Sequence, residues 1–232
     1  MMSLVVIIGI GFLLGMRHAI DPDHVVAVTT IVSRQRNIWH AGWVGIVWGV
    51  GHTITIVAVG AAIILFNLAI PTRVGLAMEL AVGLMLILLG VLNLTGVTQW
   101  ITDRFSAGHT HKSAVRAQRI GSYQFIRPLA VGIVHGLAGS AAVALLVLTT
   151  IRDIRWAVIY LLVFGVGTIA GMMVITMIIG APFAYTGKRF SSFNRALVLG
   201  SGIVSIAFGL FITLRIGFVD GLFTAHPRWT PS

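Results

Sequence analysis

Six long apolar stretches constrain the fold of this 232-residue chain more than any other feature. A hydropathy window of about 19 residues finds them at residues 3–33, 41–70, 75–98, 128–151, 156–181 and 197–218. Each is long enough for a helix to cross a hydrocarbon core of about 30 Å. Only 9% of the residues are charged, against about 25% in soluble domains. The sequence therefore predicts an all-α integral membrane protein with six transmembrane helices.

Basic residues are spread unevenly between the loops that connect these stretches. The first, third and fifth loops carry ten Lys and Arg residues, whereas the even loops and the C-terminal tail carry five. By the positive-inside rule, the odd loops face the cytoplasm and both termini face outward. The net charge of +10 then reflects topology, so nucleic-acid binding is not expected. We expect a multi-pass protein of a bacterial or archaeal inner membrane, in contact with the lipid bilayer.

A dense polar cluster interrupts the first apolar stretch. Its members are His18, Asp21, Asp23 and His24, which fall within seven residues. A charged side chain at bilayer depth costs about 2.5–3.5 kcal/mol on insertion scales. Such a cluster requires a compensating partner, and a divalent cation could be that partner.

Pro22 predicts where the first stretch breaks. Proline has no N–H group to donate to the carbonyl of His18, so this carbonyl is expected to be free. In transporters, broken helices of this kind hold ions near the membrane midplane with helix ends and unwound backbone. We expect Arg17 to pair with Asp21 or Asp23 until a metal ion displaces it.

Two short sequence echoes divide the chain into similar halves. Residues 132–136 (GIVHG) resemble residues 15–19 (GMRHA) at an offset of 117, and residues 165–169 (GVGTI) resemble residues 49–53 (GVGHT) at an offset of 116. Three helices in each half would give the halves opposite orientations, with the substrate bound where they meet. The sequence thus predicts a 3+3 inverted repeat.

This division gives three parts. Residues 1–98 form the first three-helix repeat with the metal motif, residues 99–127 a basic cytoplasmic loop, and residues 128–232 the second repeat with a short tail. His109 and His111 in the loop are interpreted as surface residues. His135 is the repeat counterpart of His18 and a candidate ligand, although packing among small residues explains it nearly as well.

The available ligands favour a transition metal. The chain has no Cys, and imidazole combined with carboxylate suits borderline divalent ions, whereas Mg²⁺ and Ca²⁺ prefer shells of oxygen atoms. The candidate metal ligands are His18, Asp21, Asp23, His24, His52 and His135. Asp21 either ligates the ion or orients an imidazole through its second ring nitrogen.

The motif His18-x-x-x-x-Asp23-His24 after Arg17, together with Gly51-His52-Thr53, resembles the nickel/cobalt transporter family of secondary permeases. Residues 135–141 (HGLAGSA) resemble its short six-helix branch, which includes urease-accessory-type membrane proteins. The resemblance implies Ni²⁺ or Co²⁺ as the transported substrate and no permanent cofactor. The motifs are compatible with import and with export, and with nickel, cobalt or zinc.

Other functions fit parts of the sequence. A metal exporter, or an accessory protein that binds metal without moving it, would need the same ligands. His18-x-x-x-x-Asp23 also matches the acyltransferase pattern, in which Asp orients a His general base, but His24 would then have no role. We expect no enzymatic activity, and no ATP hydrolysis in this chain because it has no nucleotide-binding loop. Glu79 and Asn93 are interpreted as an interface group and a helix-packing group.

Overall fold

Helices form every regular element that the structure describes. The computed structural model covers residues 4–66, 70–95, 125–138, 153–224 and 227–229. The helices are α1 (Leu4–His18), α2 (Pro22–Val32), α3 (Ile38–Phe66), α4 (Thr72–Thr95), α7 (Ile154–Arg189) and α8 (Ser191–Leu214), followed by the π-helical turn η1 (Arg215–Val219). A further helix, without a label in the figures, spans Phe125–Ala138.

Four of these helices are long and apolar enough to cross a membrane. They comprise residues Ile38–Ile63, Thr72–Thr95, Arg155–Thr186 and Ser192–Val219, and they match four of the predicted stretches. The first predicted stretch is divided between two shorter helices, α1 and α2. The fourth is described only as far as Ala138, and most of the basic loop, with His109 and His111, lies outside the described residues. The count of six spans therefore stays a prediction.

The first stretch breaks where Pro22 predicts. α1 ends at His18, and α2 begins with Pro22, whose fixed φ suits the first helical position. The expected free carbonyl is absent, however, because the backbone N–H of Asp21 donates to the carbonyl of His18 over 3.2 Å. The break is thus a hydrogen-bonded turn. It contributes side chains to the polar cluster, and the His18 carbonyl is not free to do so.

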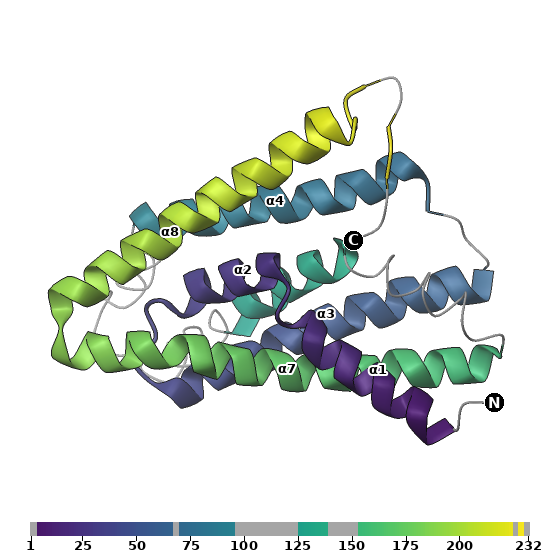
Figure 1. Cartoon of the computed structure of the whole chain (residues 1–232), viewed down its shortest axis with the longest axis horizontal. Helices are drawn as coiled ribbons and strands as arrows, with labels where there is room; N and C mark the ends of the chain where they lie inside the picture. Colours follow the sequence, from purple (N-terminus) through teal and green to yellow (C-terminus); the bar gives the residue numbers. More distant parts are fainter. Residues whose placement is uncertain (1–3, 67–69, 96–124, 139–152, 225–226, 230–232) are drawn as a thin grey trace, which may run out of the picture.

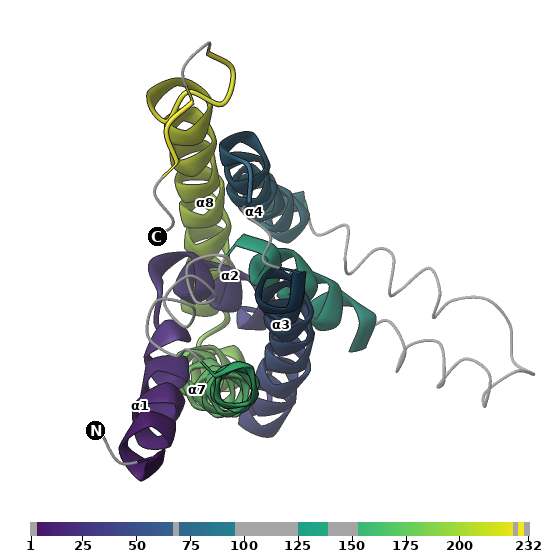
Figure 2. The ribbon, with the colours of Figure 1, turned by 90° about the vertical axis from the view of Figure 1, so that its right-hand side faces the viewer.

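The helices pack in pairs around this break (Figures 1 and 2). α4 lies along α8, α3 lies along α7, and α1 crosses α7. α2 lies between the two long pairs and contacts α4, α7 and α8. The turn between α1 and α2 is therefore held in the middle of the bundle.

Glycine residues bring α1 and the helix Phe125–Ala138 close to their neighbours. A Cβ atom on Gly15 would overlap the carbonyl oxygen of Phe164 in α7, and one on Gly132 would overlap the carbonyl oxygen of Trp48 in α3. Small residues permit this backbone approach in membrane helix pairs. Both glycines lie three residues before a histidine, His18 and His135, so these contacts position the two imidazoles.

A hydrogen-bond network around Asn93 joins α4 to α8 and to the end of α2. The buried Asn93 side chain donates to the carbonyl of Val198 over 3.1 Å and to Ser201 Oγ over 3.0 Å. Its carbonyl oxygen accepts from Ser33 Oγ and from Arg34 Nε, at 3.3 and 3.1 Å. These bonds agree with the helix-packing role predicted for Asn93, because its one buried side-chain amide connects α2, α4 and α8.

Replacing Asn93 by alanine should destabilise the protein. The change leaves the buried Ser33 and Ser201 hydroxyls and the Arg34 guanidinium with fewer partners, which costs about 1–3 kcal/mol in the free energy of unfolding. Thermal unfolding in detergent measures the loss. Thr95→Ala is the matched control, because Thr95 is exposed and, among the described residues, its hydroxyl donates only within its own helix, to the carbonyl of Val91. Equal stability of the two variants would contradict this role of Asn93.

Candidate metal centre

Four histidines from four helices converge at the break. His18 ends α1, His24 lies in the first turn of α2, His52 lies in the middle of α3, and His135 lies near the end of the helix Phe125–Ala138. The ring centroid of His24 is 4.8 Å from that of His18, 5.1 Å from that of His52 and 4.7 Å from that of His135. His24, His52 and His135 are at most 2% exposed. The sequence-predicted ligands are thus brought together, with His24 at the centre.

Two carboxylates orient two of these imidazoles. Asp21 Oδ2 lies 2.7 Å from His18 Nδ1, and Asp23 Oδ1 lies 2.9 Å from His24 Nδ1. A carboxylate accepts a hydrogen bond, so each Nδ1 carries the hydrogen and each Nε2 keeps a lone pair. Histidines that bind metals are commonly oriented in this way through the second ring nitrogen.

Several buried ring nitrogens of these histidines have few partners. Among the described residues, His24 Nε2, His52 Nδ1 and both ring nitrogens of His135 have no hydrogen-bond partner although they are buried. The Nε2 atoms of His18 and His52 lie 3.0 Å apart, so they can share one hydrogen. A buried polar atom without a partner costs about 1–3 kcal/mol. A bound cation takes one nitrogen from each ring, so it would satisfy His24 Nε2 together with one nitrogen of His135.

The ligand atoms form two overlapping groups that fit a small cation. His18, His24 and His52 make one group, and Asp23, His24 and His135 make the other, with the ligand atoms of each group within 4.8 Å of one another. Metal–nitrogen bonds of about 2.0–2.1 Å place the ligand atoms of one ion roughly 3–4 Å apart. In the first group, the 3.0 Å between the Nε2 atoms of His18 and His52 already falls in this range. His24 belongs to both groups, so one imidazole links two possible positions of an ion.

Trp48 completes the centre and was not predicted from the sequence. Its ring stacks on that of His24, with centroids 5.8 Å apart and planes 9° apart, and lies edge-on to His135 at 5.2 Å. The side chain is fully buried. Trp48 precedes His52 by four residues and therefore shares its helix face. That spacing was the available signal, and the two ring contacts place Trp48 against the imidazoles of His24 and His135.

The ion pair expected for Arg17 is not formed. The Arg17 side chain is exposed, while Asp21 contacts His18 and Asp23 contacts His24 and, at 3.6 Å, His135. Arg17 is the residue before His18, and one step along a helix turns a side chain by about 100°, away from the centre. The predicted exchange of Arg17 for metal is therefore wrong.

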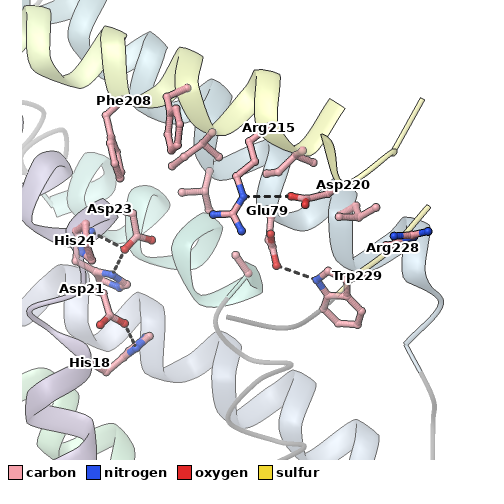
Figure 3. A pocket seen from close by; sticks show the side chains of 17 residues that line it. His18, Asp21, Asp23, His24, Glu79, Phe208, Arg215, Asp220, Arg228 and Trp229 are labelled. Atoms are coloured by element: carbon pink, nitrogen blue, oxygen red, sulfur yellow. Dashed lines mark hydrogen bonds and ion pairs between the residues drawn. The ribbon is translucent and has the colours of Figure 1, made fainter. Parts of the chain in front are cut away.

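A cavity of about 430 Å³ leads from the histidines toward one end of the bundle (Figure 3). His18, Asp23 and His24 line its inner part, and Glu79, Arg215 and Trp229 line its outer part. Glu79, interpreted from the sequence as an interface group, thus faces the same cavity as the candidate metal ligands His18, Asp23 and His24. The sequence carried one signal for this position of Glu79: an ionisable residue within a membrane helix commonly marks a substrate or ion pathway.

Comparison with known proteins identifies relatives along nearly the whole chain. The urease accessory protein UreH of Bacillus sp. (strain TB-90) is 34% identical over 224 residues, which cover 95% of this chain and 96% of the relative. Two proteins of Arabidopsis thaliana, chloroplast proteins FOR GROWTH AND FERTILITY 2 and 1, are each 26% identical over 92% of this chain and over 57% and 60% of their own lengths. No protein-family model matches the chain, and no solved structure matches it.

Proposed function

Because this chain belongs to the family of the urease accessory protein UreH, we propose that it is a secondary permease that carries Ni²⁺ or Co²⁺ across the membrane. One observation carries the proposal. Four imidazoles and two carboxylates meet at a broken helix between long apolar helices, at the inner end of a cavity. Helices broken in this way hold ions near the membrane midplane in transporters.

The chemistry of the proposed ligands favours nickel or cobalt. Imidazole nitrogens outnumber carboxylate oxygens in the cluster, and the chain has no thiolate. Such a set suits borderline divalent ions and disfavours Mg²⁺ and Ca²⁺. We infer that His18, Asp23, His24, His52 and His135 contact the ion, and that Asp21 orients His18.

Matching glycine contacts support an inverted repeat. Gly15 of α1 packs on the Phe164 carbonyl, and Gly132 packs on the Trp48 carbonyl. Gly132 is the counterpart of Gly15 at the offset of 117, and Phe164 is the counterpart of Trp48 at the offset of 116. The same pair of contacts therefore occurs twice, with the two halves exchanged.

Two further sets of contacts obey the same exchange. A Cβ on Gly167 would meet the carbonyl of Phe12, and one on Gly51 would meet the carbonyl of Leu129, again at offsets of 116 and 117. Between α4 and α8, Gly83 lies against Gly209, and Gly90 lies against Gly202. At an offset of 119, Gly202 is the counterpart of Gly83 and Gly209 is the counterpart of Gly90, so each pair is the counterpart of the other. We infer a pseudo-two-fold axis between the halves, with the histidine cluster close to it.

The repeat provides a mechanism for alternating access. The cavity opens toward the end of the bundle at Glu79 and Arg215, whereas the Asn93 network joins α2, α4 and α8 toward the other end. We place the Asn93 end in the cytoplasm, because the basic residues of the first and fifth loops lie there. The ion enters from the outer end, and rocking of one half against the other opens the Asn93 end.

Two observations concern the alternatives. The relative's name, an accessory protein, favours a second candidate: a protein that binds metal without moving it. The acyltransferase geometry is not formed, because Asp23 contacts His24, and His18 contacts Asp21 instead. A general base oriented by Asp23 would therefore have to be His24 and not the His18 of that motif.

Flux into liposomes that contain only the purified chain tests the proposal. We expect Ni²⁺ and Co²⁺ uptake under an imposed membrane potential, and no comparable uptake of Mg²⁺. Empty liposomes are the control for leakage. Protein that binds nickel but transports none would establish the accessory candidate in place of the permease.

Metal binding should weaken as the pH falls. Coordination requires neutral imidazole, and protons compete with the metal ion for the same ring nitrogens as the pH falls. We expect the nickel affinity to fall roughly tenfold or more between pH 7.5 and pH 5.5. Calorimetric titration measures it, with thermal unfolding at both pH values to verify that the protein stays folded. An affinity that does not change would contradict histidine ligation.

A further inference from the structure

Most of the chain's negative charge is concentrated around one cavity. Four of its six carboxylates line this cavity, those of Asp21, Asp23, Glu79 and Asp220, together with the guanidinium groups of Arg215 and Arg228. With neutral histidines, the lining carries two net negative charges, although the chain carries +10. A cavity with low-dielectric walls and one sign of charge raises the local concentration of the opposite ion. The lining thus matches the charge of one divalent cation.

Glu79 occupies the outer part of this cavity, and among the described residues one hydrogen bond holds its carboxylate. The indole Nε1–H of Trp229 donates to Glu79 Oε1 over 2.8 Å (Figure 3). The Trp229 ring lies directly on Gly75, one turn before Glu79, where a Cβ atom would overlap it. The absence of a side chain at Gly75 therefore allows the indole to reach the carboxylate.

Within the described part of the chain, Glu79 forms no direct ion pair with a neighbouring cationic group. Arg215 Nε lies 3.6 Å from Asp220 Oδ2, so the Arg215 guanidinium pairs with the carboxylate of Asp220 and not with that of Glu79. The backbone N–H of Arg228 donates to the carbonyl of Asp220 over 2.9 Å, which holds the segment carrying Trp229 against the mouth of the cavity. Inward of Glu79, the same cavity reaches His24, which is 2% exposed and whose Nε2 has no partner among the described residues.

We propose that Glu79 is the entrance carboxylate of the ion path, where the incoming divalent cation and the Trp229 indole compete for the same oxygen. This inference rests on the proposed transport function. The Trp229 indole occupies Oε1 of Glu79 in this structure, and a cation that takes its place at Glu79 is passed inward to the histidines. Glu79 then sets the rate of capture at low metal concentration, while the histidines set the affinity of the inner site.

Glu79→Gln separates capture from inner binding. The amide keeps the size and can still accept from Trp229, but it removes the negative charge. We expect the KM for nickel uptake to rise about tenfold, with the maximal rate and the calorimetric affinity of the inner site nearly unchanged. Asp153→Asn is the matched control: it removes an exposed carboxylate that does not line the cavity, and Asn still caps α7.

Two variants test the competition with Trp229. Trp229→Phe keeps an aromatic ring and removes the N–H donor, and Gly75→Ala displaces the ring from α4 with a residue that favours helix. Both should lower the KM for nickel uptake about threefold, which corresponds to the loss of one competing hydrogen bond. An unchanged or higher KM in both variants would refute the competition.

The outcomes separate this inference from the function on which it rests. Wild-type protein that transports no metal overturns both. Wild-type protein that transports nickel with a KM unchanged by Glu79→Gln overturns the entrance role alone and leaves the permease intact. A Glu79→Gln variant that loses inner-site affinity also overturns it, because Glu79 would then be part of the histidine site.

Discussion

Nickel binding is expected to be lost when His24 is replaced by alanine. His24 is the imidazole common to both ligand groups, so neither group keeps three ligands after the change. Changes to residues that only orient a metal ligand cost about 10–100-fold in affinity, and removal of a ligand shared by both groups should exceed about 100-fold. Calorimetric titration of the purified protein with nickel measures the loss, and flux into liposomes should disappear with it.

His40→Ala is the matched control for His24→Ala. His40 lies on α3, as His52 does, but its side chain is exposed and it belongs to neither ligand group. We expect wild-type affinity and flux. Thermal unfolding of both variants separates loss of the site from loss of the fold. A folded His24→Ala protein that binds nickel as the wild type does would eliminate the proposed centre.

The second large effect is expected at Gly15. A single methyl group there would overlap the backbone carbonyl oxygen of Phe164, and it would lie 2.9 Å from the backbone nitrogen of Thr168. Backbone atoms of α7 cannot rotate away as a side chain can, so α1 has to move. We expect Gly15→Ala to lower the free energy of unfolding by roughly 3 kcal/mol, the upper part of the range for overpacking. Thermal unfolding in detergent measures the change.

Gly9→Ala is the control within the same helix. A Cβ atom on Gly9 meets nothing within 4 Å, and alanine favours helix over glycine by about 0.8–1.0 kcal/mol. This variant should be as stable as the wild type or more so. Gly132→Ala should repeat the loss seen for Gly15→Ala, because it meets the Trp48 carbonyl in the corresponding contact. Tolerance of alanine at both positions would contradict the close helix approach.

The sequence was sufficient to predict the break and the polar cluster around it. Pro22 acts through its own backbone, and His18 and His24 lie on either side of it, so both features follow from local chemistry. Long apolar stretches predicted α3, α4, α7 and α8 for the same reason, because hydropathy is a property of each segment alone.

Contacts between distant segments could not be predicted in the same way. The pairing of Asp23 with His24 instead of Arg17 depends on how α2 is turned after the break. The role of Glu79 depends on a cavity formed by α4, α8 and the segment with Trp229, which lies 150 residues away. The stacking of Trp48 on His24 depends on how α3 is rotated against α2. The sequence does not give that rotation.

Nickel K-edge X-ray absorption spectroscopy of the nickel-loaded protein tests coordination by this cluster most directly. We predict a first shell with three or more imidazole nitrogens and at least one oxygen, unchanged when His109 and His111 are both replaced by alanine. In His24→Ala, the imidazole scattering should decrease. A first shell of oxygen atoms alone, or imidazole scattering that disappears with His109 and His111, would contradict nickel binding at the break between α1 and α2.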